Sequence, residues 1–183
     1  GGVTYFHTLH PGSAKDFHMP FLAHTCCVGT GYENHSKYGE AIYYRTSDDK
    51  GLYVNLFIAS ELDWKEKGLK LRQETLFPEE STTRLVLSTE TPVDLTLYLR
   101  YPGWATDGVK VKVNGKKIAV YSRPSSYISL KRTWKTGDVV EMEMPMSLHT
   151  EFMSDNSLKG AILYGPIVLA AELGTKDIDD TFG

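Results

Sequence analysis

Two adjacent cysteines, Cys26 and Cys27, are the residues whose type and placement best suit covalent or metal chemistry. They are the only cysteines among 183 residues. Neighbouring trans residues hold their Cα atoms about 3.8 Å apart, whereas a disulfide prefers about 5.5 Å. We therefore expect two thiols, or two metal ligands, rather than a disulfide between them.

The chain following the cysteines predicts a helix over residues 31–44. Thr30 and Glu33 have the spacing of a capping box, with Thr30 as the N-cap. Amide groups at such a helix start would lower the pKa of a nearby thiol, making it a better nucleophile or metal ligand. A buried cysteine also behaves as a small, inert hydrophobic residue. The residues by themselves leave both interpretations open.

A zinc site would need more ligands than the cysteine pair supplies. Zinc usually takes four ligands, of which Cys26 and Cys27 would be two. Nearby histidines such as His18, His24 and His35 lack the spacing of a zinc finger. If a metal binds, we expect the missing ligands to come from a part of the protein outside this sequence.

Beyond residue 47 the hydrophobic pattern changes to a period of two, which is typical of strands with one buried face. Leu95, Leu97 and Leu99 alternate with polar or aromatic neighbours, and Asn114-Gly115 predicts a tight hairpin turn. The last two strands are expected near residues 147–153 and 161–171. About nine short strands joined by turn signals predict a mainly β protein, an antiparallel β-sandwich of jelly-roll-like type.

The same patterns give a domain division. Residues 1–46 form an irregular loop and one helix, residues 47–173 form the β-sandwich, and residues 174–183 are a polar tail or linker. The net charge of −3 gives no reason to expect a nucleic-acid partner. No apolar run approaches the roughly 20 residues that cross a bilayer, so we expect no membrane insertion.

One tryptophan could serve a carbohydrate ligand. In Tyr101-Pro102-Gly103-Trp104, the indole of Trp104 could be exposed and stack on a sugar ring. The alternative, which we favour, is a corner tryptophan that covers the end of the sheet.

The run from Thr25 to Tyr38, which contains Cys26-Cys27-Val28-Gly29-Thr30-Gly31-Tyr32-Glu33-Asn34, resembles the signature of the β-L-arabinofuranosidases of glycoside hydrolase families 127 and 146. The resemblance extends over nearly the whole chain. Its other segments are residues 52–60, 99–104, 113–116 and 134–138.

This resemblance implies a parent enzyme several times longer, with an (α/α)6 helical barrel followed by β-sandwich domains. Residues 1–46 would be the end of that barrel. Zinc would be held by a Glu, an upstream Cys and the cysteine pair, with Cys26 as nucleophile and zinc ligand and Cys27 as zinc ligand. A separate upstream Glu would be the acid/base of a retaining hydrolysis of L-arabinofuranosides in plant-type glycans.

The chain lacks a third Cys, so the resemblance predicts that it is inactive by itself and binds zinc weakly or not at all. Its partners would be a carbohydrate substrate and the rest of the parent chain, and a periplasmic or extracellular location is implied. A different hypothesis is a non-catalytic carbohydrate-binding or structural β-sandwich, which exposed aromatic side chains on a flat sheet face would favour. A small thiol-based metal or redox site is a third.

Overall fold

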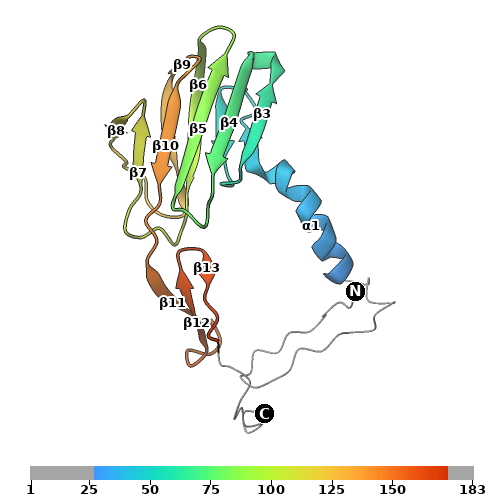
Figure 1. Ribbon diagram of the computed structural model, residues 1–183, viewed down its shortest axis with the longest axis vertical. Coiled ribbons are helices and arrows are strands. Elements are labelled where there is room, and N and C mark those ends of the chain that lie inside the picture. The colour runs from blue at the N-terminus through green and yellow to red at the C-terminus, as the bar shows by residue number, and fades with distance from the viewer. Residues whose placement is uncertain (1–26, 173–183) are drawn as a thin grey trace. The chain divides into compact units, whose positions relative to one another are not determined.

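The computed structural model describes residues 27–172. Cys26 and the predicted tail at 174–183 lie outside the described residues. The chain divides into two compact units, one of residues 1–39 and 170–183 and the other of residues 40–169, and each is described by itself. The second unit contains all the described strands (Figure 1).

The helix α1 (Cys27–Ile42) begins earlier than the sequence predicted. Thr30 lies inside it, so the prediction of Thr30 as N-cap of a capping box is wrong. The glycines at 29 and 31 suggested a later start, because each glycine costs a helix about 1 kcal/mol relative to alanine. The helix nevertheless runs through both.

Two sheets make up the sandwich, and Figure 1 shows the larger one lying in front of the smaller one. The four-stranded sheet has the order β1 (Tyr43–Arg45), β2 (Gly51–Val54), β6 (Val93–Tyr101), β9 (Ser126–Trp134). The six-stranded sheet has the order β3 (Ser60–Trp64), β4 (Leu69–Thr75), β5 (Thr82–Thr89), β10 (Val139–Glu143), β7 (Lys110–Val113), β8 (Lys116–Ile118). A 3-10 turn, η1 (Lys65–Lys67), joins β3 to β4.

The mainly β sandwich is confirmed, with one exception to the antiparallel pattern. Strands β2 and β6 pair in parallel, with Val54 opposite Leu99. These strands are not consecutive, because the chain crosses to the other sheet for β3, β4 and β5 before it returns. Strand β1 begins at Tyr43, within the range that the sequence assigned to the loop and helix.

The hydrophobic residues that recur at every second position of the strands form the core. Leu95, Leu97 and Leu99 are at most 3% exposed and point between the sheets. Trp134 is fully buried beside them, and its indole N–H donates to the Leu95 carbonyl at 2.9 Å. The sandwich therefore closes a continuous core of its own.

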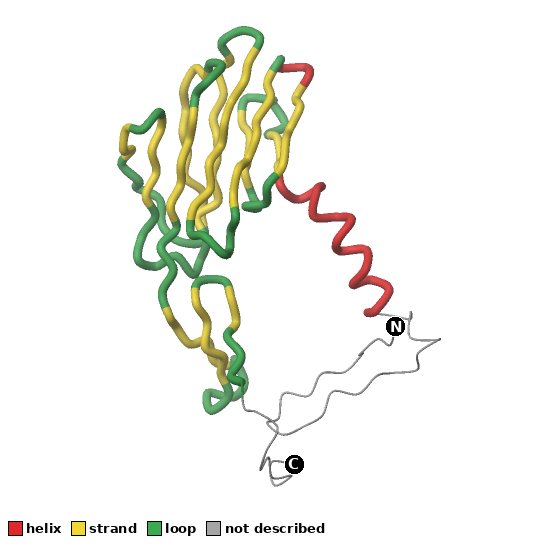
Figure 2. Tube along the Cα trace, viewed as in Figure 1, coloured by secondary structure: helices red, strands yellow, loops and turns green. Residues whose placement is uncertain are grey.

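A third, three-stranded sheet follows the sandwich, with strands β11 (Leu148–Phe152), β12 (Gly160–Tyr164) and β13 (Ile167–Val168) (Figure 2). The sequence predicted one strand over 161–171, but the chain turns at Gly165, whose φ is +55°. Among the described residues, no helix is long and apolar enough to cross a membrane.

Candidate functional site

Of the predicted thiol pair, the structure describes Cys27 only. Cys27 is the first residue of α1, and it is exposed. The first turn of a helix carries amide groups without intrahelical partners and the positive end of the helix dipole. The described helix begins four residues before the predicted start at residue 31, and these amide groups can stabilise an anion near Cys27.

Two side chains of α1 that are chemically able to bind zinc, Glu33 and His35, have other partners. The carboxylate of Glu33 pairs with the Lys37 ammonium at 3.5 Å, four residues along the helix. The His35 ring contacts the Tyr38 ring edge-to-face, with centroids 5.5 Å apart. Within residues 27–172, no three His, Cys, Asp or Glu side chains converge on a common point. Thiolates suit zinc chemically, but the described part of the chain does not complete a zinc site.

The C-terminal end of α1 is bound to the sandwich through Asn55, which follows β2. The Asn55 side-chain amide donates to the Ala41 carbonyl at 3.2 Å, and its backbone N–H donates to the Ile42 carbonyl at 2.8 Å. Its side-chain oxygen accepts a hydrogen bond from the Tyr127 hydroxyl at 2.8 Å. One side chain thus satisfies a helix-terminal carbonyl, which would otherwise need another partner, and ties it to strand β9.

A buried polar network joins the two sheets beside this connection. The Tyr43 hydroxyl donates to the Gln73 side-chain oxygen at 3.1 Å, and the Gln73 amide donates to the Thr83 hydroxyl at 3.1 Å. Burial raises the pKa of Tyr43, against the opposing effect of its hydrogen bond with Ser60. Because buried polar groups are costly unless paired, this network favours one arrangement of the sheets.

Four tyrosines on the outer face of the four-stranded sheet were not singled out from the sequence. Tyr44, Tyr53, Tyr98 and Tyr127 come one from each strand. Tyr53 and Tyr98 each lie between two buried residues, as Tyr98 does between Leu97 and Leu99, and this alternation was the available signal. We call these four residues the tyrosine face.

Trp104, in contrast, is not an exposed sugar-stacking residue. Its indole packs against the core and lies parallel to the Phe77 ring, with centroids 6.1 Å apart. The favoured interpretation, a corner tryptophan at the end of the sheet, is therefore confirmed.

These features define a β-sandwich domain with a helix leading into it, and comparison with known proteins gives its family. Residues 51–146 match the family described as β-L-arabinofuranosidase, GH127 middle domain. The chain belongs to this glycoside hydrolase family, as the sequence resemblance predicted.

Solved structures agree with this assignment. A GH127 β-L-arabinofuranosidase from Geobacillus stearothermophilus T6, Ara127N-Se, is 31% identical with a TM-score of 0.68, and the match covers 78% of this chain and 23% of that one. A structure described as a glycoside hydrolase is 27% identical with a TM-score of 0.71, covering 82% and 26%. The GH127 β-arabinofuranosidase BT3674 is 25% identical with a TM-score of 0.70, covering 87% and 27%.

The chain therefore spans between 23% and 27% of the length of these structures. No curated protein matches it.

Proposed function

We propose that this chain is part of a retaining glycoside hydrolase that removes L-arabinofuranosyl residues from plant-type glycans. The observation that carries the proposal is the match of residues 51–146 to the GH127 middle domain. The GH127 β-L-arabinofuranosidase from Geobacillus stearothermophilus supports it, at 31% identity over most of this chain.

In this proposal Cys26 is the nucleophile. Its sulfur attacks the anomeric carbon, and a carbon–sulfur bond forms as the glycosidic carbon–oxygen bond breaks. The leaving oxygen takes a proton from a glutamic acid outside this chain. The resulting glutamate then takes a proton from the water that displaces the sulfur as thiolate, with net retention. Two thiols next to a helix start suit this role, because a helix N-terminus stabilises an anion.

Cys26 and Cys27 would also contribute to a zinc site, with the remaining ligands outside this chain. When bound, zinc would keep a thiol deprotonated and make it a better leaving group. The chain supplies a minority of the parent's length, so we expect the 183 residues alone to be inactive and to bind zinc weakly or not at all.

Hydrolysis of an aryl β-L-arabinofuranoside by the full-length parent tests the proposal. Cys26→Ser should lower kcat by about 10³-fold or more, as expected for loss of a nucleophile. Glu40→Gln, an exposed change on α1, is the matched control and should leave kcat unchanged. Activity that survives Cys26→Ser would contradict the mechanism and favour the alternative of a non-catalytic β-sandwich module. Hydrolysis by the 183-residue chain itself would contradict the expected inactivity.

A further inference from the structure

We propose that the tyrosine face, together with a shallow hollow beside Tyr98, is a binding site for an uncharged glycan chain. The choice of a glycan as the ligand rests on the proposed function, because a glycoside hydrolase acts on glycans. The binding site itself is argued from the sheet's own side chains.

Three of the four tyrosine rings, those of Tyr53, Tyr98 and Tyr127, contact one another. The rings of Tyr53 and Tyr98 stack with centroids 4.5 Å apart and planes 16° from parallel. Tyr127 meets Tyr53 at 82° with centroids 4.9 Å apart, and its hydroxyl is bonded to Asn55. Tyr44 is directly opposite Tyr53 in the strand register and is 50% exposed. Rings fixed before binding lose little entropy when a ligand covers them.

Gly51 allows Tyr98 to lie over strand β2. A Cβ atom at Gly51 would be 2.7 Å from the Tyr98 ring and 2.7 Å from the Thr46 methyl group. The Thr46 hydroxyl in turn accepts from the Gly51 N–H at 2.8 Å. The backbone is therefore shaped to accommodate this ring, and the ring forms one wall of the adjoining hollow.

The polar groups around the hollow suit hydroxyl groups better than an ion. Its lining includes Asp48, Lys50, Asp94, Thr96, Tyr98 and Lys131. Both signs of charge are present, whereas a site for an anion or a cation would carry mainly one. Asp48 Oδ1 accepts hydrogen bonds from the Thr46 hydroxyl at 2.6 Å and the Lys50 N–H at 3.1 Å, which fix the carboxylate at the edge of the hollow. An aromatic surface with a few polar groups that fix orientation is the usual make-up of a small-molecule site.

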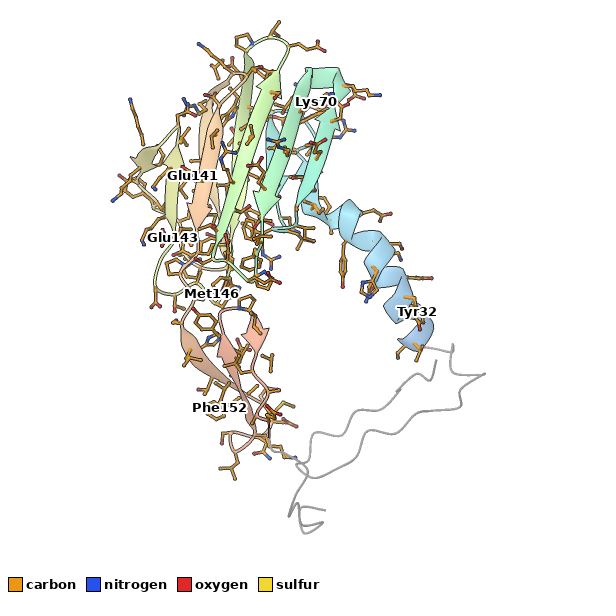
Figure 3. All side chains as sticks on the ribbon, viewed as in Figure 1. Tyr32, Lys70, Glu141, Glu143, Met146 and Phe152 are labelled. Atoms are coloured by element: carbon orange, nitrogen blue, oxygen red, sulfur yellow. The ribbon has the colours of Figure 1, made fainter. Side chains whose placement is uncertain are left out.

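A protein partner is the competing occupant, and a different surface of the same unit fits it better. The three-stranded sheet exposes aliphatic and aromatic side chains, and Figure 3 labels Phe152 among them. Leu148, Phe152 and Ile162 lie on the same face of this sheet, and each is more than half exposed. Contiguous apolar surface of this kind is typical of protein contacts. The tyrosine face mixes rings with donors and acceptors, which favours the glycan.

Titration of the 183-residue chain with linear arabinan oligosaccharides, followed by calorimetry, tests the inference, and dextran serves as the non-arabinose control. We expect saturable binding that Tyr98→Ala weakens about tenfold or more and Tyr44→Ala weakens severalfold, because each removes a stacking ring. Tyr121→Ala removes a tyrosine that is 96% exposed in a loop outside the face, so it should bind like the unaltered chain.

If the Tyr98→Ala variant melts at a much lower temperature than the unaltered chain, its binding no longer tests the inference. The binding of Tyr44→Ala and Lys131→Ala then tests it instead, because both side chains are exposed. The inference is overturned if the unaltered chain binds no arabinan, or if Tyr121→Ala weakens binding as much as Tyr44→Ala. It is also overturned if Tyr44 is protected from iodination in the sugar-free parent enzyme, because another domain would then cover the face. The proposed function is measured separately, by hydrolysis in the parent, and survives each of these outcomes.

Discussion

The two outer faces of the sandwich cover the same core with opposite chemistry. The six-stranded sheet presents charged side chains, including Lys70, Glu141 and Glu143, which Figure 3 labels on its strands. The four-stranded sheet presents the tyrosine face. Since both sheets bury alternate leucines and valines inward, the core does not determine what the outward positions carry.

Several charged side chains of the six-stranded sheet are paired with one another. Glu74 contacts the guanidinium groups of Arg72 at 2.6 Å and Arg84 at 2.5 Å, and Lys110 contacts Glu143 at 2.7 Å. Exposed pairs of this kind contribute little stability and keep a sheet face soluble. A face whose polar groups already have partners offers less to a ligand than the tyrosine face does.

The largest expected effect is the loss of stability when a core leucine is truncated. It tests whether the inner sides of the two sheets contribute equally to one core. Leu97→Ala beneath the tyrosine face and Leu87→Ala beneath the charged face remove fully buried side chains. Each should lower the free energy of unfolding by about 2–5 kcal/mol, measured by urea denaturation. Ile118→Ala, at a 37% exposed position, should cost much less. A large loss for one leucine and almost none for the other would show that the two sheets do not share one core.

The next effect concerns only the tyrosine face. Gly51→Ala forces a Cβ atom against Tyr98 and Thr46, and such overpacking should cost about 1–3 kcal/mol in thermal or urea unfolding. Gly31→Ala is the matched control, because a Cβ atom there meets nothing within 4 Å. If both changes cost the same, the position of the Tyr98 ring does not depend on the absence of a side chain at residue 51.

A smaller effect is expected where the tyrosine face joins the helix end. Asn55→Ala and Tyr127→Phe each remove the hydrogen bond between these two side chains. Asn55→Ala also leaves the Ala41 carbonyl without its amide donor, so we expect it to cost about 1–2 kcal/mol and Tyr127→Phe about 1 kcal/mol. The double variant should cost less than the sum. Additive losses would mean that the two residues act independently.

The comparison also shows which parts of the fold the sequence could predict. The inward leucines of β6 and the Asn114-Gly115 turn follow from local patterns, and both are present, with φ of +50° and +75° at the turn. The parallel pairing of β2 with β6 does not, because it joins strands distant in the sequence. The tyrosine face depends on that pairing: Tyr53 meets Tyr98 only once β2 lies beside β6.

For the candidate site, the sequence predicted a helix beside the cysteine pair but not the residue at which the helix begins. The capping-box pattern placed the start of the helix at residue 31, whereas the described helix begins at Cys27 and runs through Gly29 and Gly31. Cys26 lies outside the described residues, so its predicted role as nucleophile stays a prediction. The expectation that the remaining zinc ligands lie outside this chain likewise stays a prediction.

The smallest effect should appear on the charged face and depend on pH. Hydrogen bonding and charge from Arg84 and Arg72 hold the pKa of Glu74 below its usual range, so the ion pair stabilises the fold above the unfolded-state pKa of about 4.3. That stabilisation is lost as the pH falls through the lower folded-state value. In melting experiments, Glu74→Gln should therefore melt slightly below the unaltered chain at pH 7, and the difference should vanish in acid and shrink in high salt.

Glu61→Gln makes the same change on this sheet at a residue with no ion pair among residues 27–172, and should show no such pH-dependent difference. A difference for Glu74→Gln that persists at low pH would mean that side-chain packing, rather than charge, organises this face, and the contrast between the two faces would lose its electrostatic basis.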